Sequence, residues 1–132
     1  MRARVVVCLV MAAILLTAAA VAQDAVKADP KHYTVVSENA KVRILKIHYG
    51  PHEKSVMHSH PDSVVIPLSD LNAKFTMPDG KTETRAMKHG EAQFTPAVTH
   101  LPEDTSDKPF EAILVELKGS SARAAAAAPA KK

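Results

Sequence analysis

Two histidines stand two positions apart near the middle of the chain, in the stretch "SVMHSHPDSVV" at residues 55–65. Side chains at positions i and i+2 of a β-strand point to the same face, so we expect His58 and His60 to act together. A third histidine, His100, follows the separate stretch "FTPAVT" at residues 94–99. Imidazoles from two strands can take three positions around one divalent transition metal, for which Fe, Zn, Mn, Ni and Cu are the candidates.

The metal interpretation has an alternative, because two histidines at this spacing are a weak signal when they stand alone. His58 and His60 could instead line a polar pocket or face water. Metal binding requires neutral rings, and the ordinary histidine pKa of about 6.5 allows neutral rings at neutral pH. The residues alone leave both interpretations open.

Three further polar residues are candidates for the same site. Asp62 could direct its carboxylate toward the histidines from the adjoining turn, although capping the turn after Pro61 is the commoner role for such a residue. Glu53 could reach the site from the preceding loop. Gln93 could face the interior and hydrogen-bond a ligand, or it could face solvent.

Short β-strands are the elements that must position these residues. Prolines are scattered through the chain, and no window shows a sustained apolar period of helical length. The segments between prolines and turns are rich in Val, Ile, Thr, Phe and Tyr, which indicates a sandwich or barrel of many strands. The expected strands span 32–37, 41–49, 55–60, 63–68, 72–78, 81–88, 91–96 and 111–118.

Turns and face patterns add detail to this all-β prediction. Asp79-Gly80 predicts a two-residue hairpin turn, Gly90 predicts a second turn, and residues 101–109 are expected to form a loop. The last strand is apolar on both faces, which is typical of a closed barrel or of paired sheets. The second strand alternates imperfectly, so either both of its faces are covered or a bulge near Ile44 shifts its register.

The histidines, together with glycines and a proline, resemble the two motifs of the cupin superfamily. The first motif is matched by "GPHEKSVMHSHPDSVV" and the second by "GEAQFTPAVTHLPED". The matching residues are Gly50, His58, His60, Gly90, Pro96 and His100. The likeness covers residues 32–118, and it implies a single all-β domain with a cupin-type jelly-roll β-barrel. It also implies a metal site made of the three histidines.

The chain departs from the cupin pattern at several positions. The gap between Gly50 and His58 is longer than usual, and Val64 or Val65 stands where a metal-binding glutamate is usual. Asp104 takes the place of the usual asparagine. The resemblance therefore implies three neutral ligands, similar to cupin-like dioxygenases that use three histidines without a carboxylate.

The resemblance implies a small cupin that binds a divalent transition metal and binds or acts on a small molecule in the barrel. An enzyme of this kind would be a metal-dependent dioxygenase or isomerase, and the sequence assigns no catalytic residue. The alternative is a non-catalytic small-molecule-binding or structural cupin without bound metal, since a fold does not fix a function. Pairing through outer strands, which is common among cupins, implies a homodimer.

The N-terminal segment has the features of a signal peptide. Arg2 and Arg4 precede an apolar stretch from Val5 to Ala20, and "AVAQ" offers a cleavage site after Ala22. The expected organisation is a signal peptide at 1–22, a linker at 23–31, the barrel at 32–118 and a disordered Ala-rich tail at 119–132. We therefore expect export to the periplasm or the medium, with no stable membrane insertion after cleavage.

Charge and cysteine content exclude other classes of partner and ligand. The formal net charge is +3, and it falls when cleavage removes Arg2 and Arg4, so the mature chain has no basic footprint for nucleic acid. Cys8 is the single cysteine and lies inside the expected signal peptide. The mature chain would therefore contain no disulfide and no thiolate ligand.

Overall fold

The computed structural model describes residues 23–119. A single helical turn, α1, is followed by nine strands. The elements are α1 (Ala25–Ala28), β1 (Tyr33–Glu38), β2 (Val42–Tyr49), β3 (His58–His60), β4 (Ser63–Pro67), β5 (Leu71–Thr76), β6 (Thr82–Met87), β7 (Gln93–Thr95), β8 (Val98–Asp104) and β9 (Phe110–Leu117). The prediction of an all-β fold is confirmed.

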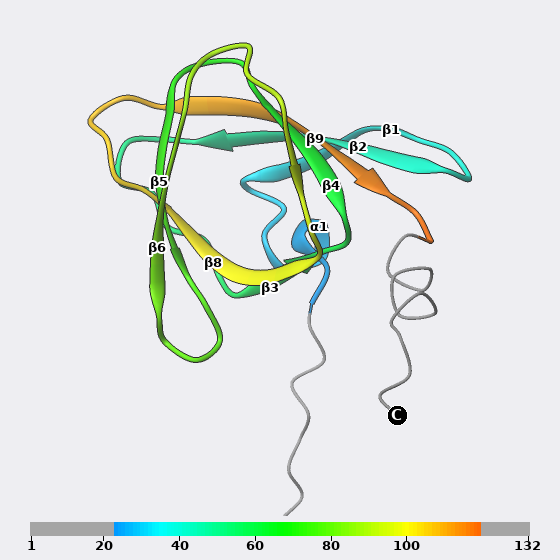
Figure 1. Cartoon of the computed structure of the whole chain (residues 1–132), viewed down its shortest axis with the longest axis horizontal. Coiled ribbons are helices and arrows are strands. Elements are labelled where there is room, and N and C mark those ends of the chain that lie inside the picture. Colours follow the sequence, from blue (N-terminus) through cyan, green and yellow to red (C-terminus); the bar gives the residue numbers. More distant parts are fainter. Residues whose placement is uncertain (1–22, 120–132) are drawn as a thin grey trace, which may run out of the picture.

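The strands form two sheets that face each other (Figure 1). The five-stranded sheet has the order β1-β2-β9-β4-β7, and the four-stranded sheet has the order β3-β8-β5-β6. Every pairing between these strands is antiparallel. Apart from β1–β2 and β5–β6, strands adjacent in a sheet are not consecutive in the chain, so the chain crosses repeatedly between the two sheets, as in a jelly roll.

β9 is the central strand of the larger sheet, and its sequence explains why. Phe110, Ala112 and Leu114 alternate with half-buried residues and are themselves buried. The opposite face carries Ile113 and Val115, which are also partly covered. β9 pairs with β2 along all eight of its residues and with β4 on its other side. Cover on both faces is what the sequence pattern predicted.

The irregularity predicted near Ile44 lies in the strand opposite it. β2 runs beside β9 without a break. In β1, however, Val35 pairs with Leu45 and Ser37 pairs with Ile44, which leaves Val36 as an extra residue. Such a bulge bends the bulged strand, and Val36 is 61% exposed there.

The chain from Leu101 to Asp104 was expected to be part of a loop, and that prediction is wrong. These residues belong to β8, which pairs with β5 through Asp104. Pro102 misled the prediction because proline cannot donate to a ladder. Its carbonyl accepts a hydrogen bond from the amide of Ser55, which lies in the segment before β3.

The hairpin between β5 and β6 reverses where the sequence predicted, but its loop is longer. Gly80 has a φ of 84°, whereas Asp79 has no positive φ. The amide of Met77 donates to the carbonyl of Lys81, and the amide of Gly80 donates to the carbonyl of Met77. Gly80 is therefore the one residue of this loop with a positive φ, and the predicted two-residue turn is not formed. Gly90 also has a positive φ of 82°, as its predicted turn requires.

Residues 23–31 pack against the barrel. Ala25 is fully buried in the hydrophobic core, and Asp24 caps α1 by accepting hydrogen bonds from the amides of Val26 and Lys27. The amide of Ser59 in β3 donates to the carbonyl of Gln23. The predicted signal peptide at 1–22 and the tail beyond residue 119 lie outside the described residues. Within residues 23–119, no helix has the length and apolar character needed to cross a membrane.

Candidate metal centre

The three predicted histidines meet inside the barrel. β3 and β8 are antiparallel neighbours, and their register places His58 directly opposite His100. His60 lies two positions further along β3, on the same face. All three side chains are buried, and each offers a ring nitrogen within 4.8 Å of the other two. Residues distant in the chain therefore form one imidazole cluster.

Hydrogen bonds fix the orientation of two of these rings. Nδ1 of His58 donates to the carbonyl of Val56 at 2.8 Å, and Nδ1 of His60 donates to Oε1 of Glu116 at 2.8 Å. Each ring then presents an unprotonated Nε2 when it is neutral, and the two Nε2 atoms are 3.0 Å apart. Two lone pairs at this distance repel each other unless a cation or a proton lies between them.

His100 supplies a second sign that the cluster suits a cation. Both of its ring nitrogens are buried, and neither has a hydrogen-bond partner among residues 23–119. A buried polar group without a partner is costly. Nitrogen ligands at about 2.0–2.1 Å from one ion are themselves about 3 Å apart, which agrees with the 3.0 Å between the Nε2 atoms of His58 and His60. The residues present fit a metal ion.

Burial keeps two of the rings uncharged. Removal from water lowers the pKa of His58 to about 4 and that of His100 to about 3, and the charge of neighbouring His60 adds to both effects. Arg85 lowers the pKa of His100 further. Both rings are therefore neutral at neutral pH, which is the form that binds a metal.

Glu116 is the residue of the site that sequence reasoning missed. Its side chain is almost fully buried, and its Oε2 accepts hydrogen bonds from Nε of Arg43 at 2.7 Å and from Nη2 at 2.6 Å. Arg43 also pairs with Asp24, the cap of α1. The contact between Glu116 in β9 and His60 in β3 joins the two sheets. The sequence offered a clue to Glu116. It lies two positions after Leu114 and four after Ala112, so its side chain points to the same buried face of the strand.

The other candidates lie outside the cluster. Asp62 accepts a hydrogen bond from the amide of Ala97 at 2.8 Å, so its carboxylate holds the connection between β7 and β8 in place. Glu53 accepts hydrogen bonds from Lys31, His32 and the amide of Gly50. Neither carboxylate is among the residues that converge.

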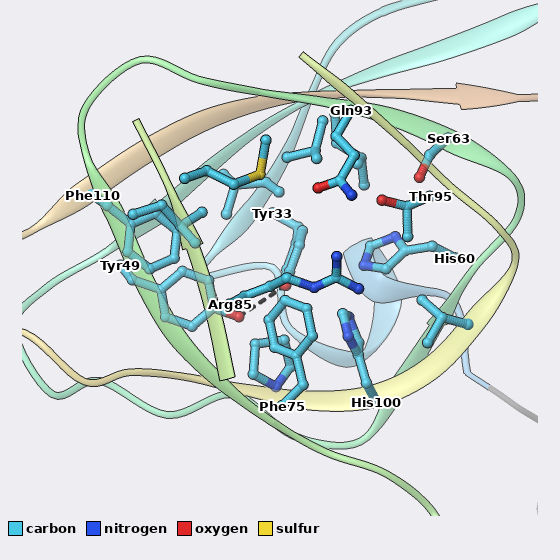
Figure 2. Close-up of a pocket in the computed structure, with 17 residues that line it drawn as sticks. Tyr33, Tyr49, His60, Ser63, Phe75, Arg85, Gln93, Thr95, His100 and Phe110 are labelled. Atoms are coloured by element: carbon cyan, nitrogen blue, oxygen red, sulfur yellow. Dashed lines mark hydrogen bonds between the residues drawn. The ribbon is translucent and has the colours of Figure 1, made fainter. Parts of the chain in front are cut away.

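A cavity of about 70 Å³ lies beside the histidines (Figure 2). His60 and His100 form part of its wall, and Gln93 also lines it. Val65, at one of the two positions where cupins usually carry a glutamate, contributes an apolar side chain to the wall. The space is several times what one water molecule needs, so it can hold a small ligand.

The hydroxyl groups of two tyrosines, Tyr33 and Tyr49, add polar atoms to a largely apolar cavity. The hydroxyls of Tyr33 and Tyr49 are 2.8 Å apart and hydrogen-bonded. The ring of Tyr33 packs edge-on against His58, with centroids 4.7 Å apart, while Tyr49 stacks on His32 at 4.2 Å. Burial raises the pKa of both tyrosines, so both hydroxyls keep their protons.

Comparison with known proteins identifies the fold. No family model matches the chain, and no curated protein matches it. Among solved structures, it is similar to a cupin domain from Bordetella pertussis Tohama I, with a TM-score of 0.61 and 26% identity over 66% of this chain and 92% of that one.

Two more solved structures show the same architecture. An RmlC-like cupin family protein with a double-stranded β-helix fold, from Methanocaldococcus jannaschii, gives a TM-score of 0.54 at 15% identity, covering 70% of this chain and 84% of that one. A protein with a double-stranded β-helix domain from Klebsiella pneumoniae gives 0.52 at 20% identity, covering 67% and 77%. The cupin resemblance and the jelly-roll barrel are confirmed.

Proposed function

We propose that this chain, which has the fold of the cupin superfamily, binds one divalent transition-metal ion through His58, His60 and His100. It would hold a small molecule beside that ion in the barrel cavity. The observation that carries the proposal is the pair of Nε2 atoms 3.0 Å apart, with His100 buried beside them without a partner. A cation resolves both the repulsion and the unmet hydrogen-bonding capacity.

The chain's own residues prepare the site in advance. The carbonyl of Val56 and the carboxylate of Glu116 hold two rings with Nε2 toward the centre. Partners of this kind, one step removed from a metal, fix the tautomer of a ligating histidine and raise its basicity. When bound, the ion would supply Lewis acidity and free coordination positions, because three neutral ligands leave its charge uncompensated. Fe, Zn, Mn, Ni and Cu remain the candidates.

The cavity would determine what can approach the ion. Its wall is mostly apolar, so it excludes bulk water and accepts a small carbon skeleton. Tyr33 lines this space, and burial raises its pKa, so its hydroxyl stays protonated and can form hydrogen bonds but does not act as a base. Oxygen uptake by the metal-loaded protein on addition of small molecules would separate an oxygenase from a binding protein.

Metal analysis of the purified protein tests the proposal. We expect about one equivalent of a transition metal per chain, and we expect His100→Ala to lose most of it because one of three ligands is removed. The matched control is His48→Ala, which replaces a histidine on the exposed face of β2. Equal metal content in the wild type and His100→Ala would exclude this site. No metal after growth in metal-rich medium, with no effect of a chelator on stability, would favour a metal-free binding or structural protein.

A further inference from the structure

Arg85 differs from the other arginine that the structure describes. Arg43 contacts two carboxylates. Arg85 lies on β6, is half-buried and lines the cavity. Its guanidinium carbon is 5.8 Å from the centroid of the Phe75 ring, and it forms no ion pair with any residue from 23 to 119. Figure 2 shows its guanidinium extended across the cavity toward His60 and His100.

The rest of the cavity supplies no negative charge to match Arg85. Among the described residues that line it, none is an aspartate or a glutamate. The cavity wall includes the apolar side chains of Ile47, Val65, Leu71, Met87 and Leu114. A charge that is partly removed from water and left unpaired is unfavourable. A small anion bound in the cavity would pair with this guanidinium, for which residues 23–119 supply no anionic partner.

We propose that the cavity binds a small monocarboxylate with a short apolar chain, and that Arg85 pairs with its carboxylate. A guanidinium presents two parallel N–H donors that match the two oxygens of a carboxylate. One arginine balances one negative charge, which a monocarboxylate carries, whereas a phosphate ester carries about two. The carbon chain would lie against the aliphatic wall. This inference rests on the part of the proposed function that places a small molecule in the cavity.

Titration with butyrate, followed by amide chemical shifts in metal-free and metal-loaded protein, tests this assignment. We expect butyrate to bind wild type, and butyramide, which has the same shape without the charge, to bind at least about tenfold more weakly. Arg85→Gln should weaken butyrate binding by about tenfold or more, and Arg85→Lys should bind with intermediate affinity. The control is Lys88→Gln, which removes one positive charge from an exposed side chain just after β6.

Three results would overturn the assignment: no binding of butyrate to wild type, equal affinity for butyrate and butyramide, or equal butyrate affinity in Arg85→Gln and wild type. Metal content, measured on the same samples, keeps the two proposals apart. Unchanged metal with lost butyrate binding in Arg85→Gln supports both. Butyrate binding that depends on Arg85, in a wild-type protein that takes up no metal when metal is added, supports this assignment and contradicts the metal proposal.

Discussion

Each histidine of the cluster is held by a different kind of contact. His58 is oriented by a backbone carbonyl, His60 by the carboxylate of Glu116, and His100 by packing against the Phe75 ring at 4.5 Å. A carbonyl cannot be removed by substitution, and His100 is itself a proposed ligand. Glu116 is therefore the side chain through which the affinity of the cluster can be altered without changing a ligand.

We predict that Glu116→Gln lowers metal affinity by about 10–100-fold, the usual effect of losing a carboxylate behind a ligating histidine. Glutamine can still accept the hydrogen bond from Nδ1 of His60, but it lacks the negative charge that raises ring basicity and pairs with Arg43. Competition with a chromophoric chelator measures the change. Glu111→Gln, on the opposite, half-buried face of the same strand, should leave the affinity unchanged. Equal affinities for Glu116→Gln and wild type would rule out this role.

At this scale, spacing in the sequence predicted the cluster but not its surroundings. The i, i+2 rule placed His58 and His60 on one face, a separate stretch offered His100 as the third ligand, and the cupin resemblance supported all three. Glu116 could have been found from the parity of its strand. The position of Arg85 could not, because it depends on which strand pairs with β6 and on a cavity that exists only after the two sheets have packed.

At the scale of elements, the register between β3 and β8 creates the site. A shift of one residue would turn His58 and His60 to the opposite face. The sequence predicted most strands but missed β8: residues 98–100 were assigned to no strand, and Leu101–Asp104 were expected in a loop, where Pro102 argued against a strand. A strand tolerates a proline only where no neighbouring strand needs the missing N–H. The tertiary structure decides where that is, so the sequence alone does not show it.

The segment at residues 23–31, expected from the sequence to be a linker, offers a test at this scale. Ala25 is fully buried between α1 and the barrel, so Ala25→Leu should overpack the contact and lower the free energy of unfolding by about 1–3 kcal/mol. Lys27→Leu, on the exposed side of the same turn, should change it by less than about 0.5 kcal/mol. Urea unfolding of both variants measures the difference. Equal stabilities would mean that the segment does not contribute to the fold.

At the scale of the whole molecule, carboxylates paired in the folded state determine how the protein responds to acid. Burial alone would raise the pKa of Asp29, but hydrogen bonds from Ser55 and His32 outweigh it and hold that pKa below the ordinary 3.8. Hydrogen bonds from the Lys31 side chain and from the Gly50 amide lower the pKa of Glu53 to about 2. The unfolded chain then takes up protons before the folded one does, so stability falls as the pH drops.

We therefore predict that the metal-free protein keeps the stabilisation from Asp29 above about pH 4 and loses it as the pH falls through the lowered pKa of that residue. Asp29→Asn should be less stable than wild type at pH 6, and its stability should fall less steeply below pH 4, because asparagine does not titrate. Urea unfolding between pH 6 and pH 2.5 measures both slopes. Parallel curves for the two proteins would contradict the role of Asp29.

The central claim is that three imidazoles from β3 and β8 hold one ion inside the barrel. Crystals grown with cobalt or zinc, with diffraction recorded on both sides of the absorption edge of that metal, test this claim most directly. We expect one strong anomalous peak at about 2.0–2.2 Å from a ring nitrogen of each of His58, His60 and His100. A cluster without a peak, or a metal bound only by exposed histidines such as His52, would contradict it.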